Sequence, residues 1–156
     1  MKDLHELLAG QPLFEGIEPD HIEFLVRCCK LVHCRPGETV FAEGDEADQC
    51  FVVRTGMVIE GLHLPDRGEV GLATVEPGEL LGWSWLIPPH RWSLDARAGS
   101  ETSLFAFDAK CLREKLDGDP QLGYVLMSRL AQVAGERLLM ARHQLVDFYG
   151  TRGHRA

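Results

Sequence analysis

The pattern of apolar and polar positions changes twice along the chain, and it predicts helices at both ends with strands between them. Near the N-terminus, Leu4, Leu7 and Leu8 recur at helical spacing, and Gly10 follows as a stop. Pro19 suits the first position of a second helix. The apolar stripe of that helix consists of Ile22, Leu25, Val26 and Cys29.

Between Lys30 and Asp108 the spacing shortens to that of strands. Short β-rich runs are separated by turn signals such as Pro36-Gly37, Gly44-Asp45 and Thr55-Gly56. Because no helical pattern intervenes, we expect an antiparallel β-roll or jelly-roll barrel rather than a parallel sheet. The predicted strands are Thr39–Phe41, Phe51–Arg54, Val58–Leu64, Val70–Val75 and Ser103–Phe107.

The C-terminal part returns to helical spacing. Asp108 caps a short helix, and Asp119-Pro120 is a strong start for a long one. Residues 120–149 contain no further proline, so this helix would be about 45 Å long. We expect it to pair with a second copy and form a homodimer, the alternative being that it folds back onto its own barrel. Its stripe is Leu126, Leu130, Ala134, Leu138, Ala141, Leu145 and Phe148, and the tail Gly150–Ala156 is expected to fray.

The length of 156 residues fits one domain, residues 1–156. The predicted fold class is α+β, with N-terminal helices, a β-roll over about residues 30–108 and C-terminal helices over about residues 109–149.

Charge and composition narrow the range of partners. The net charge of -8 argues against nonspecific binding to nucleic acid or to an anionic membrane. The N-terminus lacks the apolar run of a signal peptide, so we expect a cytoplasmic location.

The five cysteines follow no secreted pattern and are expected to be buried reduced thiols. A metal cluster at Cys28, Cys29 and Cys34 is disfavoured, since adjacent cysteines do not easily aim at one ion.

Motifs of catalysis are absent from the sequence. The seven histidines are scattered, without the His-x-His pair that a metal-dependent jelly-roll enzyme needs. No Gly-x-Ser-x-Gly, HExxH or Walker sequence is present. We therefore expect no enzyme, no catalytic residue and no metal site.

Two stretches carry a more specific signal. PLFEGI, beginning at Pro12, and PGETVFAEGDEADQCFVVRTGMV, beginning at Pro36, closely resemble the opening half of cyclic-nucleotide-binding domains of the catabolite-activator (Crp/Fnr) superfamily. Gly37, Gly44 and Gly56 fall where that family places glycines in tight turns. The resemblance covers about residues 10–148 and implies a regulatory module in which Phe41, Phe51 and Val53 face the interior of the roll.

The same resemblance implies where a ligand would bind. In the family, a phosphate-binding cassette begins Gly-Glu-Leu, forms a short helix and ends with arginine followed by small residues. The glutamate binds a ribose hydroxyl and the arginine pairs with the cyclic phosphate. Here the beginning is intact as Gly78, Glu79, Leu80 and Leu81. The alternative for Glu79 is a bond to the backbone of its own turn or to an arginine.

The end of the cassette departs from the family. Trp92 occupies the position of the phosphate arginine, Ser93 follows it, and Arg91 comes one residue early. Two consecutive prolines, Pro88 and Pro89, disfavour the cassette helix. Arg91 either meets an anion or faces solvent, and Arg97 supplies a second positive charge or pairs with Glu79 or Asp95. The predicted ligand-binding set is Gly78, Glu79, Leu80, Leu81, Arg91, Trp92, Ser93 and Arg97.

All three tryptophans lie within ten residues, as Trp83, Trp85 and Trp92. They either form a stacking platform for a purine or fill the space that a nucleotide would occupy. The first alternative predicts a sensor of cAMP, cGMP or a related anion, read by an unidentified downstream protein. The second predicts a degenerate module that acts as a dimeric scaffold.

The chain ends seven residues after Tyr149, so we expect no helix-turn-helix and no direct DNA binding. No cofactor is predicted.

Overall fold

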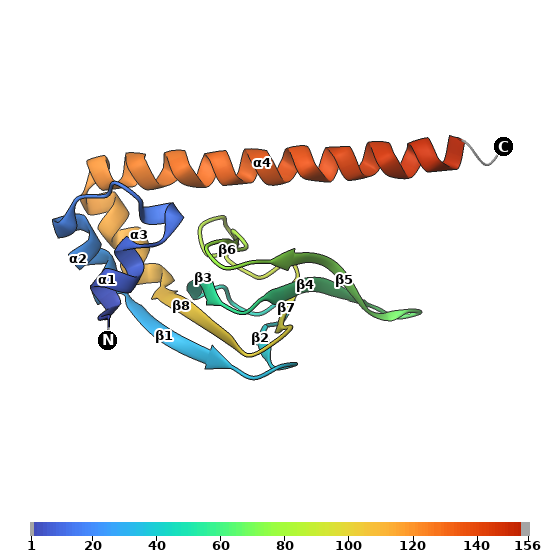
Figure 1. The fold of residues 1–156 in the computed structure, drawn as a ribbon, viewed down its shortest axis with the longest axis horizontal. Coiled ribbons are helices and arrows are strands. Elements are labelled where there is room, and N and C mark those ends of the chain that lie inside the picture. Colours follow the sequence, from blue (N-terminus) through green and yellow to red (C-terminus); the bar gives the residue numbers. More distant parts are fainter. Residues whose placement is uncertain (1, 154–156) are drawn as a thin grey trace. The chain divides into compact units, whose positions relative to one another are not determined.

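The computed structural model describes residues 2–153, and the side chains up to residue 150. It has two units (Figure 1). The first, up to Asp119, contains every strand of the described chain and three α-helices. The second begins at Pro120 and is a single helix, α4 (Pro120–Gly153). Among the described residues, no helix combines the length and the apolar character needed to cross a membrane.

The first unit begins and ends with helices. These are α1 (Leu4–Ala9), the 3-10 turn η1 (Pro12–Phe14), α2 (Pro19–Arg27) and α3 (Ala109–Gly118). The strands between them are β1 (Cys29–Cys34), β2 (Thr39–Phe41), β3 (Gln49–Thr55), β4 (Val58–Leu64), β5 (Gly68–Val75), β6 (Leu80–Leu81), β7 (Asp95–Ala98) and β8 (Thr102–Asp108).

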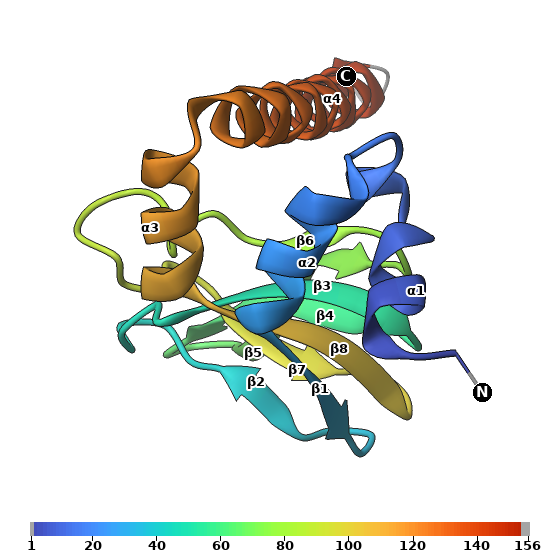
Figure 2. The same cartoon turned by 90° about the vertical axis from the view of Figure 1, so that its left-hand side faces the viewer.

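The strands form two four-stranded antiparallel sheets, in the orders β1-β8-β3-β6 and β2-β7-β4-β5. In the first sheet, alternate residues face different layers. Phe107 contacts Phe14 of η1, at 5.9 Å between ring centroids, so its face carries the helices. Figure 2 looks from that side, with α2 and α3 in front of the strands. Phe51 faces the second sheet, where it stacks with Phe41. The fold is therefore the predicted α+β antiparallel roll.

Local signals in the sequence explain several boundaries. Asp108 caps α3 as predicted, since its Oδ1 accepts a hydrogen bond from the Cys111 amide at 2.8 Å. Pro19 occupies the first position of α2, also as predicted. The Asp108 side chain pairs one of the backbone N–H groups that are otherwise unpaired at a helix start. Pro19 has no N–H group that would need a partner there.

Other boundaries differ from the prediction. Cys29 does not extend the helical stripe but begins β1, an edge strand that pairs only with β8. Strands β6 and β7 were also not predicted, because two and four residues are too short for a period to show. The expected fraying of Gly150–Ala156 is wrong for residues 150–153, which continue α4. Residues 154–156 lie outside the described chain.

The prediction of reduced thiols is wrong for two of the five cysteines. Cys28, at the end of α2, forms a disulfide with Cys111 of α3. The two are 83 positions apart in sequence, so only the folded chain brings them together. Cys29, Cys34 and Cys50 are free thiols. Burial raises the pKa of Cys29 to about 12, and burial followed by the nearby Cys29 raises the pKa of Cys50 as well.

At position 56, both the backbone conformation and the lack of room for a side chain require glycine. Gly56, in the turn between β3 and β4, has a φ of 85°, which disfavours any side chain. A Cβ there would also press on the Glu101 carbonyl and come within 2.6 Å of Thr102 Oγ1. Gly37 has the same φ of 85°, but a Cβ there would meet nothing within 4 Å.

Gly56→Ala should therefore destabilise the fold more than Gly37→Ala. The matched φ means that Gly37→Ala reports backbone strain alone, about 1 kcal/mol, whereas Gly56→Ala adds overpacking of roughly 1–3 kcal/mol. The free energy of unfolding in urea measures both. Equal losses in the two variants would contradict the steric part of this account.

Candidate functional site

The beginning of the cassette-like segment is a turn fixed to β3. Gly78 has a φ of 89°, so a left-handed backbone opens the turn. The Gly78 amide donates to the Val53 carbonyl at 2.7 Å, and the Val53 amide donates to the Glu79 carbonyl at 3.0 Å. Leu80 and Leu81 follow as β6, buried and paired with β3. Four of the predicted site residues thus belong to one rigid turn and strand.

The Glu79 side chain serves this turn. It is half-buried, and its Oε1 accepts a hydrogen bond from the Glu76 amide at 3.0 Å. A carboxylate that accepts a backbone N–H stabilises the turn in which it sits. The structure thus matches the alternative in which Glu79 bonds its own turn.

The Trp92 side chain lies in the core. It is 4% exposed, and its ring stacks on Phe41 with centroids 3.7 Å apart and planes 5° apart. The Phe51 ring is 6.4 Å away. Gly82, with a φ of 70°, lies so close that a Cβ there would be 3.0 Å from the six-membered ring of Trp92. The indole fills the interior between the sheets.

Arg91 points the other way, as alternation along an extended segment requires. It is exposed, and its Nη1 donates to the Gly44 carbonyl at 3.0 Å. Its backbone forms an isolated β-bridge with Glu46. A hollow of about 410 Å³ opens beside it, and its lining includes this one guanidinium and three carboxylates. The residues lining this hollow are Val40, Phe41, Gly44, Asp45, Glu46, Asp48, Gln49, Phe51, Arg91 and Trp92.

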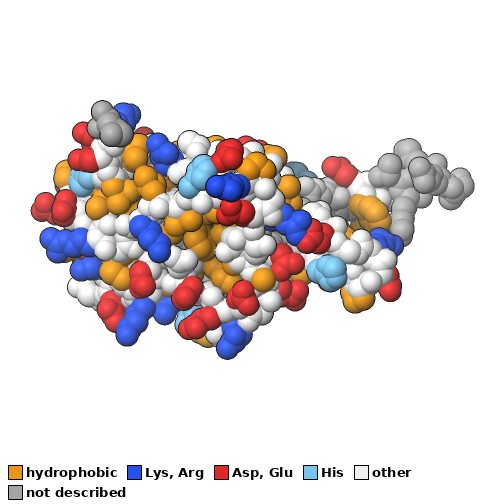
Figure 3. Space-filling model, turned by 90° about the horizontal axis from the view of Figure 1, so that it is seen from below, with side chains coloured by type: hydrophobic (Ala, Val, Ile, Leu, Met, Phe, Trp, Pro, Cys, Tyr) orange, Lys and Arg blue, Asp and Glu red, His pale blue; other side chains and the backbone are white. Residues whose placement is uncertain are grey.

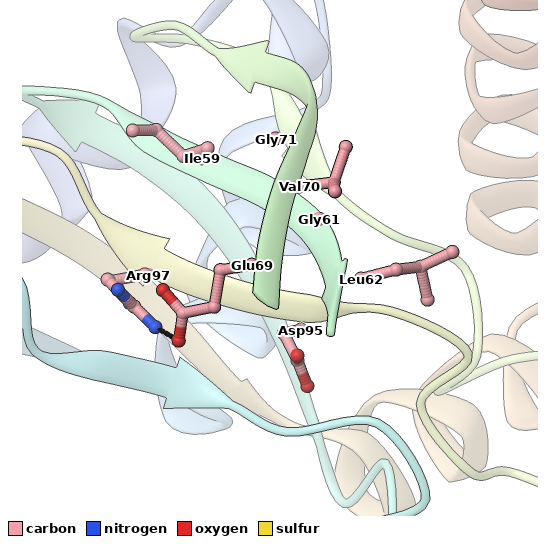
Figure 4. A pocket seen from close by; sticks show the side chains of 8 residues that line it. All are labelled: Ile59, Gly61, Leu62, Glu69, Val70, Gly71, Asp95 and Arg97. Atoms are coloured by element: carbon pink, nitrogen blue, oxygen red, sulfur yellow. Dashed lines mark ion pairs between the residues drawn. The ribbon is translucent and has the colours of Figure 1, made fainter. Parts of the chain in front are cut away.

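Arg97 lies on the outer face of the second sheet. Its neighbours in β7, Ala96 and Ala98, are buried, whereas Arg97 pairs in register with the exposed Ile59. Its guanidinium forms an ion pair with Glu69 of β5, drawn in Figure 4. The pair borders a groove of about 280 Å³, to which Asp95 adds a second carboxylate. The groove is lined by Ile59, Gly61, Leu62, Glu69, Val70, Gly71, Asp95 and Arg97.

The segment between Gly82 and Arg91 contains turns but no assigned helix. Trp83 is half-buried, and its carbonyl accepts bonds from the Leu86 and Ile87 amides, a single turn before the prolines. Trp85 is 1% exposed, and its carbonyl accepts a hydrogen bond of 2.6 Å from Nη1 of Arg113. Ser93, the last predicted site residue, is exposed. The cassette-like segment is therefore anchored by packing and by α3.

Two residues of this region were not singled out from the sequence. Glu60 is 8% exposed on β4, in register with Ala96 on the interior face. The alternation from Val58 through Glu60 could have placed that carboxylate inward. Arg113 carries no comparable signal, because its partner is a backbone carbonyl 28 positions away.

The side chains on one face of the molecule are of mixed charge. On the face drawn in Figure 3, acidic and basic side chains are interspersed with apolar patches. The arginines predicted for an anion thus lie on two different outer surfaces, each beside carboxylates. The interior holds Trp92 and Glu60.

This roll, with its glycine turns and its cassette-like segment, has the architecture of a cyclic-nucleotide-binding domain. The sequence model of the cyclic nucleotide-binding domain matches residues 31–119, and the chain belongs to that family, in its Crp/Fnr branch.

Known relatives agree with this assignment. A CRP-like cAMP-activated global transcriptional regulator of Mycobacterium tuberculosis is 28% identical over 95% of this chain, and the chain spans 64% of that relative. Glutaminase 1 of Bradyrhizobium diazoefficiens is 33% identical over 89% of the chain, which covers only 22% of the enzyme. A cyclic nucleotide-binding domain from Methylobacillus flagellatus shares the fold, with a TM-score of 0.76 at 21% identity over 92% of this chain and 80% of that one.

Trp92→Ala should cost about 3–5 kcal/mol of stability, because it removes a buried indole and leaves a cavity against Phe41. Trp83→Ala is the matched control, since Trp83 is only half-buried and should lose less than half as much. Chemical denaturation followed by circular dichroism measures both. Similar losses would show that Trp92 is not the central packing residue.

Proposed function

We propose that this member of the family is a regulatory module that acts by contact with other proteins. In this proposal it binds no cyclic phosphate at the place where the family has its phosphate arginine. The observation that carries the proposal is the buried indole of Trp92, stacked on Phe41. The resemblance assigns the phosphate arginine to this same position. A side chain that is part of the core, and that has no charge, does not replace a guanidinium there.

Electrostatics support the same conclusion. Arg91 and Arg97 each have carboxylates as neighbours, and Glu60 adds another carboxylate to the interior. A phosphate brought near these groups would meet like charge, at a cost that grows as water is excluded. Each arginine is already engaged within the protein, Arg91 with the Gly44 carbonyl and Arg97 with Glu69.

The regulatory role comes from the relatives. The M. tuberculosis protein is described as a transcriptional regulator, and we carry over only the role of a regulatory domain. We infer that the chain is not itself an enzyme, since it matches less than a quarter of the glutaminase. Its output is a contact with another protein.

A second candidate is the ligand sensor, which one observation favours. The turn at Gly78, Glu79, Leu80 and Leu81 keeps the family's order and is held in place by β3. In that case Glu79 would exchange its bond to Glu76 for one to a ribose, and Arg91, Ser93 or Arg97 would meet cAMP, cGMP or a related anion.

Thermal unfolding with 1 mM cAMP or cGMP separates the two candidates. We expect the melting temperature to stay unchanged. A sensor with ligand at 100 times its Kd would gain about 2.7 kcal/mol, a rise of roughly 5–10 °C. Isothermal titration calorimetry with the same nucleotides provides a readout that does not depend on stability. A melting shift that disappears in Glu79→Ala would refute our proposal and establish the sensor.

We also infer that α4 pairs with α4 of a second copy. Leu138, Ala141, Leu145 and Phe148 follow the three- and four-residue steps of a coiled-coil seam. The three large members of this seam are more than half exposed in the single chain, at 54%, 56% and 53%. Such an apolar stripe on one helix is what a second copy would cover.

Leu138→Glu should convert the dimer into monomers, because two carboxylates would face each other in the seam. His143→Glu adds the same side chain five positions further along, on the opposite side of the helix, and should leave the dimer intact. Light scattering at several concentrations gives the mass. A wild-type protein that is already monomeric would rule out this interface.

A further inference from the structure

The helices α2 and α3 form an antiparallel pair that is linked along its whole length (Figure 2). At one end, the disulfide joins Cys28 to Cys111. At the other end, His21 Nε2 lies 2.8 Å from Asp119 Oδ2. Between them the Lys115 ammonium sits 5.0 Å from the centre of the Phe24 ring. Of these three links, only the disulfide is covalent, and only it can be opened by a thiol reagent.

The helix α3 is also attached to the cassette-like segment. Arg113 follows Cys111 by two positions and donates to the Trp85 carbonyl at 2.6 Å. A charge-assisted bond of this length, from a half-buried arginine, fixes the backbone of the segment to the helix. Along the chain, α3 ends at Gly118, directly before Asp119 and the start of α4. A change in the freedom of α3 therefore reaches the cassette-like segment through Arg113.

We propose that the Cys28–Cys111 disulfide is a redox-controlled lock on α3, opened by a dithiol reductant and closed by exchange with a disulfide oxidant such as oxidised glutathione, which is released as two thiols. The closed form holds α3 against α2 and keeps Arg113 on the Trp85 carbonyl. The open form leaves α3 with weaker links only, so that both the helix and the cassette-like segment gain freedom. This control needs no nucleotide, and it holds whether or not the function proposed above is correct.

The chemistry is ordinary thiol–disulfide exchange. A thiolate of the reductant attacks Sγ of Cys111, which belongs to the more exposed residue of the pair, since Cys111 is half-buried and Cys28 is 6% exposed. The S–S bond breaks, and its electron pair leaves with Cys28, which takes up a proton. The second thiol of the reductant then displaces Cys111. Two electrons and two protons enter the protein, and the reductant becomes a disulfide.

The three other cysteines do not compete for this exchange. Cys50 is 3% and Cys34 is 6% exposed, and Cys29 is half-buried in β1. Burial raises the pKa of all three thiols, with the Glu38 carboxylate adding to the effect at Cys34 and the Cys29 thiol at Cys50. Thiols that remain protonated at neutral pH are poor nucleophiles, so the bond does not migrate within the chain.

Thiol counting and hydrogen exchange test the lock on the full chain. Protein purified in air and denatured without reductant should show three reactive thiols of the five, and five after dithiothreitol. On reduction, the melting temperature should fall by roughly 10 °C, as expected for a bond that closes a long loop. Amide exchange in α3 and in residues 83–91 should rise about tenfold or more, while that of β4 and β5 stays unchanged.

Variants separate the lock from a general stabilising role. The double variant Cys28→Ser/Cys111→Ser should behave like the reduced wild type and ignore the reductant, whereas Cys34→Ser should respond as wild type does. Arg113→Met should keep the response of α3 but lose that of residues 83–91. If the double variant fails to fold, reduction of the wild type itself still gives the comparison.

Glutathione buffers of graded ratio show whether the lock is a switch. We expect reversible opening and closing within that range in the folded protein. Five reactive thiols in the air-oxidised protein would overturn the proposal. So would a bond that resists every buffer until the chain unfolds, or a rise in exchange that is equal in all elements.

Discussion

The stack of Trp92 on Phe41, with Phe51 beside it, packs the two sheets of the roll against each other. The rest of the interior is arranged around these three rings. Phe41 comes from one sheet and Phe51 from the other, and Trp92 lies against both. Burial of three aromatic rings in contact is among the largest stabilising contributions that a small roll contains. On the function proposed above, the same packing takes up the position at which the resemblance places a phosphate-binding arginine.

Much of this fold could be predicted from the sequence, and the failures have physical causes. Turns at Gly37, Gly44 and Gly56 specify their local backbone by themselves, so the strands β2, β3 and β4 beside them were predicted, whereas β1 was not. The strand β6 has two residues and exists because β3 offers it a partner, which no local pattern reveals. The disulfide depends on two helices meeting after 83 positions. Contacts of that kind are properties of the tertiary structure.

The candidate site was predicted in part. The sequence placed Glu79 at a turn and left open whether Trp92 stacks on a ligand or fills the core, and in the structure its indole is buried. It could not orient Arg91 and Arg97, because the direction of a side chain in an extended segment depends on which of two faces is covered. Both arginines have partners in the protein: Arg91 donates to the Gly44 carbonyl, and Arg97 forms an ion pair with Glu69.

Because Gly82 lies so close to the Trp92 ring, substitutions at these two positions, which are ten residues apart, should depend on each other. Any side chain at 82 would press on the indole, and a smaller residue at 92 would leave a hole that glycine at 82 has no side chain to fill. Lineages that descend from a common ancestor of this chain should therefore exchange both residues or neither. Alignments of such lineages would show the pair as covarying columns, separating those with a tryptophan-filled roll from those with an open one.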